Sequence, residues 1–592
     1  MRRSLATVTA GVAVLAVLAC AAAAAGGQQS DRWKAWPSSR MPGPTAAREV
    51  TFPPYEIRTL ANGLRVIVVV HHEQPAVSMR MIIGAGAAQD PAGKAGLATL
   101  MASLLDQGTA TRTSEEIADT IDFVGGALGT GAGTDLSYVN VLVLKDSFGL
   151  ALDLMADVVR RPAFAPEESE RQRQQVLSAL QVNAQDPDYV AGVVIDRLIY
   201  GFHPYGIPSN GTPESVAALT REDLVGFHDR WFAPNNAILA IVGDLTPEEA
   251  FAGAEKTFGA WPRRDLPVTS FPEPPEPTRR VVLIDRPGAV QTEIRVGNLG
   301  IPRRHRDYDA FNLAVRVLGG EGANRLQRVL RSERSLTYGA SADVQSLKQA
   351  GGIVAETDTR SEATGEALRI VMDEFSRLQR DPVSELELGD AKAYMTGSFP
   401  LTIETPDAIA MQVLNVLFYD LDVKTLQTYR ERVNRITSDD IQRVARAYLR
   451  PGRLSIVLVG DAATVLPQLA RAGVSDVERI PIDEVDLSSA TLRRPRRADA
   501  LDAEGAGTGR LEDRTVTVPG VLPGERVEVE LRAGTSRGRL SRVITSSPAR
   551  IEPRCAHVRE CGGCPWQHMA YAGQLRLKRA RLQAAVGAAA GR

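Results

Sequence analysis

The stretch Gly96–Thr109, GLATLMASLLDQGT, has the apolar periodicity of a helix with one buried face. Its apolar residues follow the i, i+3, i+4, i+7, i+8 rule of an amphipathic helix: Leu97, Leu100, Met101, Leu104 and Leu105. Thr99, Ser103 and Asp106 fall on the opposite face of that helix. Taken alone, the stretch predicts an ordinary core helix with a small polar face.

An internal duplication surrounds this helix and organises residues 50–480. The run RWFAPNNAILAIVGD ends at Asp244, and the run AYLRPGRLSIVLVGD ends at Asp461. Their prolines, Pro234 and Pro451, are 217 residues apart, as are the two terminal aspartates. Two landmarks at one offset indicate two domain-sized copies, residues 50–265 and 280–480.

Each copy mixes strand-like and helix-like segments. β-branched runs such as Val66–Val70 alternate with longer amphipathic stretches such as Ser147–Arg160. This mixture predicts the α+β class, with helices packed on one face of a sheet. Residues 266–279 join the copies, and their proline-rich run FPEPPEPT (Phe271–Thr278) favours an extended, semi-rigid spacer that holds two halves around a gap.

The surroundings of the first helix resemble those of the insulinase/pitrilysin family of zinc peptidases. In that family an inverted motif, His-x-x-Glu-His, lies on a helix between "GLA" and "GT". On this frame the histidines fall on Thr99 and Ser103 and the glutamate falls on Ala102. The family's third ligand, a glutamate on a later helix, falls on Ala179. Hydroxyl and methyl groups do not replace imidazole or carboxylate at zinc, so the resemblance implies a degenerate site without the metal.

The second copy resembles the same family in GGEGANRLQRVLRSERSLTYGAS, residues 319–341. A glycine-rich turn precedes "RL", and a tyrosine follows a leucine–arginine pair by seven residues. The matching residues are Arg331 and Tyr338. In the family this pair binds the substrate carbonyl and stabilises the tetrahedral intermediate, which fits a guanidinium and a phenol that donate hydrogen bonds. The alternative is a surface arginine beside a core tyrosine.

The resemblance therefore implies a two-lobed clamshell that has lost the zinc chemistry and kept the carbonyl-binding pair. Some bacterial members of the family work as two chains, one with the zinc and the base, the other with the Arg–Tyr pair. This chain is similar to the second kind, so we expect a peptide substrate and a zinc-bearing partner of the same family. A non-catalytic peptide-binding or scaffold protein is the alternative function.

The N-terminus predicts export across a bacterial inner membrane. Arg2 and Arg3 precede an apolar run from Leu5 to Leu18, and residues 1–29 have the pattern of a signal peptide. Cys20 follows this run as in a lipoprotein cleavage site, so a periplasmic and a lipid-anchored chain are both open. The net charge of −2 identifies no partner.

The last residues resemble another family. Residues 481–510 read as a linker, and residues 511–552 resemble a TRAM domain, a small RNA-binding β-barrel. Residues 553–592 resemble the iron–sulfur start of uracil-C5 RNA methyltransferases and carry Cys555, Cys561 and Cys564. Three thiolates imply a partial [4Fe–4S] ligand set, and RNA binding belongs to the ancestry of this tail. A zinc knuckle, a fused gene boundary and a truncated methyltransferase are the alternatives.

Overall fold

The computed structural model describes residues 51–320, 324–494, 500–501, 506–511, 514–531, 535–555, 566–575 and 578–579. From residue 53 onward they belong to one compact unit. The expected signal peptide with Cys20 lies outside the described residues, as do Cys561 and Cys564. None of the helices in the described ranges is long and apolar enough to span a bilayer.

The first repeat is built on a six-stranded mixed sheet with the order β1-β2-β6-β3-β5-β4. Its strands are β1 (Tyr55–Thr59), β2 (Arg65–Val70), β3 (Ala76–Ile83), β4 (Ala127–Ala132), β5 (Ser137–Leu144) and β6 (Ala237–Gly243). The β-branched run expected as a strand is β2, which pairs in parallel with β6. Such strands are buried on both faces and therefore read as continuous apolar runs.

The second repeat has an equivalent sheet with the order β12-β7-β11-β8-β10-β9. Its strands are β7 (Arg280–Asp285), β8 (Gln291–Leu299), β9 (Ala340–Gln345), β10 (Gly352–Arg360), β11 (Ser455–Gly460) and β12 (Val477–Pro481). Five consecutive strands match those of the first sheet, and only the outer strand differs, because β12 pairs in parallel where β1 pairs antiparallel. The expectation of two similar α/β halves is confirmed.

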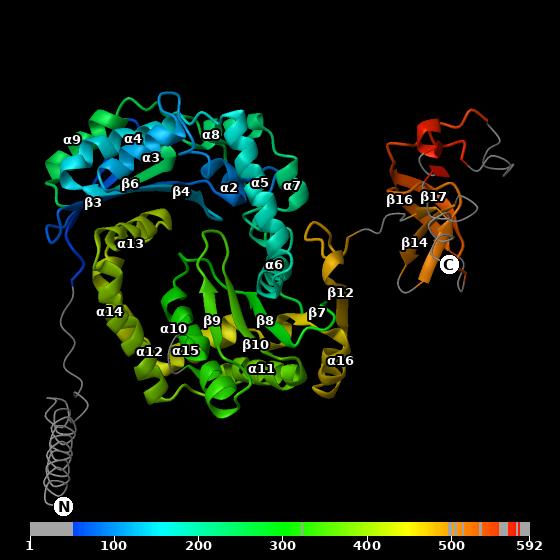
Figure 1. The fold of residues 1–592 in the computed structure, drawn as a ribbon. Coiled ribbons are helices and arrows are strands. Elements are labelled where there is room, and N and C mark those ends of the chain that lie inside the picture. The colour runs from blue at the N-terminus through cyan, green and yellow to red at the C-terminus, as the bar shows by residue number, and fades with distance from the viewer. Residues whose placement is uncertain are drawn as a thin grey trace, which may run out of the picture. The chain divides into compact units, whose positions relative to one another are not determined.

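Helices of each repeat cover one face of that repeat's own sheet (Figure 1). In the first repeat they are α2 (Leu97–Ala102), α3 (Ser114–Phe123), α4 (Phe148–Arg160), α5 (Pro166–Asn183), α7 (Pro213–Ala217), α8 (Arg221–Trp231) and α9 (Pro247–Phe258). In the second they are α10 (Tyr308–Gly319), α11 (Thr364–Arg380), α12 (Glu385–Ser398), α14 (Thr425–Arg435), α15 (Ser438–Tyr448) and α16 (Ala462–Arg471). The duplication extends to helix capping, because Thr220 and Asp223 start α8 as Thr437 and Asp440 start α15.

The opposite face of each sheet is covered by a helix from the other repeat. Helix α6 (Pro187–Tyr200) belongs to the first repeat and packs on β8 and β11 of the second sheet. Helix α13 (Pro406–Phe418) belongs to the second repeat and packs on β3 and β6 of the first sheet. The apolar faces of both helices are buried, for example at Val194 of α6 and Val413 of α13. The two repeats thus complete each other's cores.

The tail differs from the closed barrel that the sequence predicts over 511–552. In its described residues, β13 (Ala500–Leu501), β14 (Gly507–Leu511) and β15 (Arg514–Val518) form one small sheet, and β16 (Arg526–Leu531) and β17 (Gly538–Thr545) form another. An isolated bridge, Thr517 to Arg537, connects them. The ladders described here leave these sheets open, so a barrel is not found.

Candidate functional site

Helix α2 begins at a buried carboxylate cap. Both oxygens of Asp90 accept hydrogen bonds from the first backbone N–H groups of the helix, at 2.8 Å from Gly96, 3.1 Å from Leu97 and 2.8 Å from Ala98. Burial raises the pKa of Asp90 to about 7, although these three donors act in the opposite direction. Gly96 has φ +92°, the left-handed region that favours glycine. The N-terminus of α2 is therefore fixed by Gly96 and by Asp90, six residues before it.

The helix itself is shorter than the periodicity predicts. It ends at Ala102, and the apolar residues Leu104 and Leu105 stay buried in the turn that follows. Gly108 has φ +108° and turns the chain away from the helix axis. The predicted apolar face is nonetheless the buried face.

The three positions that match the family's zinc motif hold side chains engaged elsewhere. The hydroxyl of Thr99 donates to the carbonyl of Ser209 at 2.7 Å. The hydroxyl of Ser103 donates to the carbonyl of Leu100 at 2.8 Å, within its own turn. The methyl group of Ala102 is fully buried. No imidazole or carboxylate stands at these positions of α2.

The fourth matching position lies on a neighbouring helix. Ala179 is exposed on α5, and α5 is in contact with α2. The structure thus brings together the two helices that carry the degenerate ligand positions, while the residues on them do not fit zinc. Across the described residues, no group of three or more His, Cys, Asp or Glu is placed to hold a metal ion.

Arg331 and Tyr338 come together on the surface of the second repeat. Arg331 lies on a π-helical segment, η5 (Gln327–Glu333), and its guanidinium carbon is 4.8 Å from the centroid of the Tyr338 ring. The tyrosine is 83% exposed, so it is not a core residue. Short π-helical segments are rare and often mark functional sites. Both side chains are available to a ligand.

A mostly buried ion pair just before η5 anchors the segment that carries Arg331. Arg325, just before η5, forms two hydrogen bonds with the Glu387 carboxylate of α12, at 2.9 Å and 3.1 Å. The Arg325 side chain is only 4% exposed. Burial raises the pKa of Glu387, but the Arg325 hydrogen bonds and charge outweigh it, and the pKa is lowered to about 2. Sequence reasoning missed this anchor, although Arg325 is the arginine of the "RL" signature.

A polar cavity of about 720 Å³ adjoins the pair. Gln327 begins η5 and Gly339 follows Tyr338, and both line the cavity. The cavity's charged lining residues are Asp188, Glu293, Arg295, Arg316, Asp343, Glu356 and Asp358. Asp188 comes from α6 of the first repeat, and the others come from the second repeat. This cavity also escaped sequence reasoning, because its residues come from separate strands and helices of both repeats and meet only in the folded chain.

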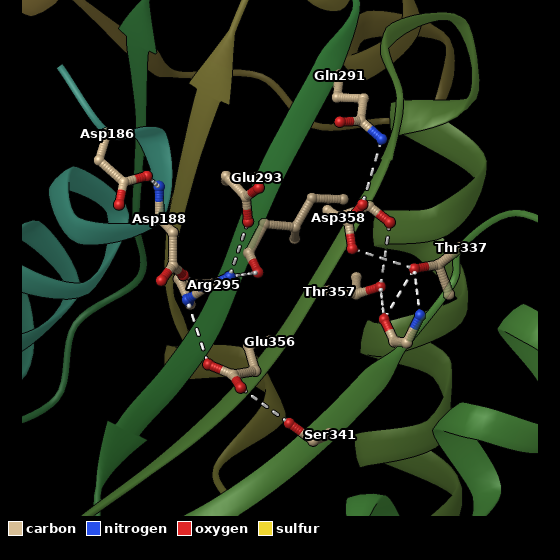
Figure 2. Close-up of polar contacts among 12 residues, drawn as sticks. Asp186, Asp188, Gln291, Glu293, Arg295, Thr337, Ser341, Glu356, Thr357 and Asp358 are labelled. Atoms are coloured by element: carbon tan, nitrogen blue, oxygen red, sulfur yellow. Dashed lines mark hydrogen bonds and ion pairs between the residues drawn. The ribbon is translucent and has the colours of Figure 1, made fainter.

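Arg295 is the central charge of this cavity. Its side chain is 6% exposed and forms ion pairs with Asp188, with Glu293 at 3.3 Å and with Glu356 at 3.5 Å. Figure 2 shows the guanidinium between these carboxylates, which come from α6, β8 and β10. Burial, reinforced by neighbouring carboxylates, raises the pKa of Glu293 even though Arg295 acts in the opposite direction.

Arg80 is the first-repeat counterpart of Arg295. Arg80 faces Ala240 of β6, and Arg295 faces Val457 of β11, which is 217 residues later. Arg80 lies 3.6 Å from Asp407, the second residue of α13, as Asp188 is the second residue of α6. The inter-repeat pair is thus duplicated, but the additional carboxylates around Arg295 are not.

Fold and site together define a class: a two-repeat α/β peptidase fold in which the residues at the zinc-ligand positions cannot bind zinc. Comparison with known families agrees. Residues 65–209 match the profile of the insulinase family (peptidase family M16), and residues 218–395 match the profile of the peptidase M16 inactive domain. The peptidase-like part of this chain belongs to the insulinase family.

Curated relatives cover most of the peptidase-like part. An uncharacterised zinc protease of Mycobacterium leprae is 26% identical over 428 residues, which cover 70% of this chain and 94% of the relative. One from Bacillus subtilis is 23% identical and covers 66% of this chain and 94% of the relative. Zinc protease PqqE of Helicobacter pylori is 21% identical, with 69% and 93% covered.

Solved structures share the fold. A peptidase M16 inactive domain from Pseudomonas fluorescens has a TM-score of 0.66 and 29% identity, and covers 69% of this chain and 98% of that chain. A protease from Helicobacter pylori has a TM-score of 0.65 at 20% identity, with 69% and 99% covered. A chain of complex III from Candida albicans has a TM-score of 0.60 at 15% identity, with 71% and 99% covered.

Proposed function

We propose that this chain is the exported, zinc-less subunit of a two-chain insulinase-family metallopeptidase. It binds peptide and presents Arg331 and Tyr338 to the carbonyl oxygen beside the scissile bond, while a partner of the same family supplies zinc and the general base. The observation that carries the proposal is the exposed Arg331–Tyr338 pair, with the guanidinium over the phenol ring, in a chain whose own α2 lacks zinc ligands.

The chemistry follows from the two side chains. A carbonyl oxygen gains negative charge when the tetrahedral intermediate forms, and donors fixed beside it stabilise the transition state more than the ground state. The guanidinium of Arg331 carries several N–H donors, and the phenol of Tyr338 carries one O–H donor. The Arg325–Glu387 pair fixes the start of the segment on which Arg331 lies.

The proposal for export rests on the sequence of residues 1–29, which lie outside the described residues. The tail is outside this proposal: Cys555 is exposed, and Cys561 and Cys564 are not among the described residues. A partial iron–sulfur centre and RNA binding therefore stay as sequence predictions.

The test uses the full chain together with the zinc-bearing family member that copurifies with it and carries His-x-x-Glu-His. Arg331→Ala should lower kcat of peptide cleavage by about 10²–10³-fold, the usual loss for one such donor. Arg331→Lys should restore little, because an ammonium lacks the planar fork of donors. Tyr338→Phe should act in the same direction and more weakly.

Arg334→Ala provides the matched control, since Arg334 is exposed, lies three residues further on and pairs only loosely with Glu366, at 3.9 Å. It should leave kcat unchanged. A pull-down of the partner reports assembly for every variant. Turnover by Arg331→Ala close to that of the unchanged chain, with assembly intact, would refute the carbonyl role and favour the scaffold alternative.

A further inference from the structure

Two carboxylates of the cavity face each other directly across the second sheet. Glu293 of β8 is the register partner of Asp358 of β10 in an antiparallel pair. Like charges at directly opposed positions destabilise a sheet. The pKa of Glu293 is raised, first by burial and also by the charge of Asp358. The repulsion between Glu293 and Asp358 therefore does not contribute to the stability of the fold.

The two arginines of the cavity, Arg295 and Arg316, do not neutralise its carboxylates. Arg295 is shared among Asp188, Glu293 and Glu356, and Arg316 lies 3.5 Å from Asp343. Asp358 accepts only from neutral groups among the described residues, at 3.4 Å from the Gln291 amide and at 3.5 Å from the Thr337 hydroxyl (Figure 2). Among the residues that the structure describes, five carboxylates therefore meet two guanidinium groups in one cavity, and none of these cations pairs with Asp358.

The first repeat shows that this acidity is not a requirement of the fold. Register places Ser78 where the second sheet has Glu293, and Leu142 where it has Asp358. The same relation places Asn140 opposite Arg80, where Glu356 stands opposite Arg295. Both repeats keep the arginine and its inter-repeat aspartate, and only the second surrounds the arginine with carboxylates.

The cavity also lies where a peptide would be held. Its wall includes Gln327 of η5, the segment that bears Arg331, and Gly339, which follows Tyr338. Its volume of about 720 Å³ is within the range of ligand sites. The cavity therefore adjoins both the segment that bears Arg331 and the residue that follows Tyr338.

We infer that the cavity is a subsite for a cationic side chain, arginine or lysine, of the bound peptide. The side chain's guanidinium or ammonium group lies between Glu293 and Asp358 and relieves their repulsion. The preferred substrates of the assembled peptidase then carry a basic residue near the scissile bond. This inference rests on the proposed peptide binding and adds the substrate class to it.

The test compares two fluorescent nonapeptide pools, randomised at all positions except the centre, which is arginine in one pool and citrulline in the other. Citrulline keeps the shape of arginine and removes its charge. Fluorescence anisotropy with the full chain should show about tenfold tighter binding of the arginine pool, the effect of one charge-assisted contact. The variant Glu293→Gln/Asp358→Asn should bind both pools alike.

Two controls separate a subsite from a structural effect. Glu362→Gln/Asp373→Asn removes two exposed carboxylates outside the cavity and should keep the preference for arginine. The melting temperature of the single variant Asp358→Asn should stay the same or rise, because it removes one of two opposed like charges and leaves the Glu293–Arg295 ion pair in place. A fall in melting temperature with the loss of preference would assign the carboxylates a structural role and overturn the inference.

The outcomes also separate this inference from the proposed function. Equal, measurable binding of both pools by the unchanged chain would overturn the cationic subsite and leave peptide binding intact. Binding of neither pool would count against peptide binding itself, and the inference would fall with it.

Discussion

Arg295 of β8 and Asp188 of α6 form an ion pair between the two repeats, and Arg80 and Asp407 form the equivalent pair in the opposite direction. The duplication therefore preserved the fold of each copy. It also preserved an ion pair that connects the two copies. The surroundings of the two arginines diverged, since Arg295 has two further carboxylates within ion-pair distance.

This divergence predicts unequal losses when the arginines are removed. Arg295→Met leaves the mostly buried Glu293 carboxylate without its counter-charge and should cost about 2–3 kcal/mol of unfolding free energy, less than for a fully buried pair because Asp188 and Glu356 are more than half exposed. Arg80→Met should cost only about 1 kcal/mol, because Asp407 is half exposed and stays hydrated. Urea unfolding of the full chain at pH 7 measures both. Equal losses would show that the carboxylate cluster does not depend on Arg295.

The anchor before η5 gives a second prediction. Glu387→Gln leaves the buried Arg325 guanidinium without its counter-charge, at a cost of about 2–3 kcal/mol, below the range for fully buried pairs because Glu387 is partly exposed. The pKa of Glu387 is lowered, so its stabilising effect is present above about pH 4.5 and is lost as the pH falls through about 2. The stabilities of the variant and the unchanged chain should therefore converge near pH 2. A constant difference between pH 2 and pH 7 would contradict this prediction.

Asp196 of α6 predicts the opposite pH dependence of stability. Burial raises the pKa of Asp196 to about 6, although the Gln345 amide donates to it at 2.8 Å. The folded state therefore keeps a proton that the unfolded state has lost, so stability is highest below about pH 4 and falls as the pH rises through about 6. Asp196→Asn should flatten this fall and be more stable than the unchanged chain at pH 7.5, as thermal unfolding at several pH values would measure. An unchanged pH profile would contradict it.

The degenerate zinc positions predict that the chain binds no zinc and that restoring the ligands creates a zinc site. With Cys555, Cys561 and Cys564 replaced by serine, the full chain should contain no stoichiometric zinc and cleave no peptide alone, since α2 offers no ligand. Thr99→His/Ser103→His/Ala179→Glu on the same background should bind about one zinc, because α2 and α5 are in contact. Metal analysis after dialysis measures both. Zinc in the cysteine-free parent would contradict the first expectation, and failure of the triple variant would show that the helices lie too far apart.

Local patterns in the sequence predicted much of the fold. The apolar face of Leu97 and Leu100, the β-branched run of β2 and the 217-residue offset all reflect nearest-neighbour periodicity or repetition, and each was found. The family frame led to Arg331 and Tyr338, which the structure brings together. Their role in binding the substrate carbonyl stays a proposal.

Long-range features could not be predicted in this way. The crossing of α6 and α13 onto the opposite sheets depends on tertiary packing, since both helices read simply as amphipathic. The opposition of Glu293 and Asp358 depends on strand register between residues 65 positions apart. The closed barrel was expected from a resemblance over 511–552, but the described strands of the tail form two small sheets joined by one bridge.

The exchange of α6 and α13 makes the proline-rich joint dispensable for holding the repeats together. Each repeat alone would expose the apolar face of one sheet and the apolar face of one helix, so neither half is a self-sufficient folding unit. A protease cut within residues 266–279 would therefore leave a nicked particle that still migrates as one species under native conditions. Two separately synthesised halves would have to find each other before either could be stable, which makes the single polypeptide an obligate heterodimer in covalent form.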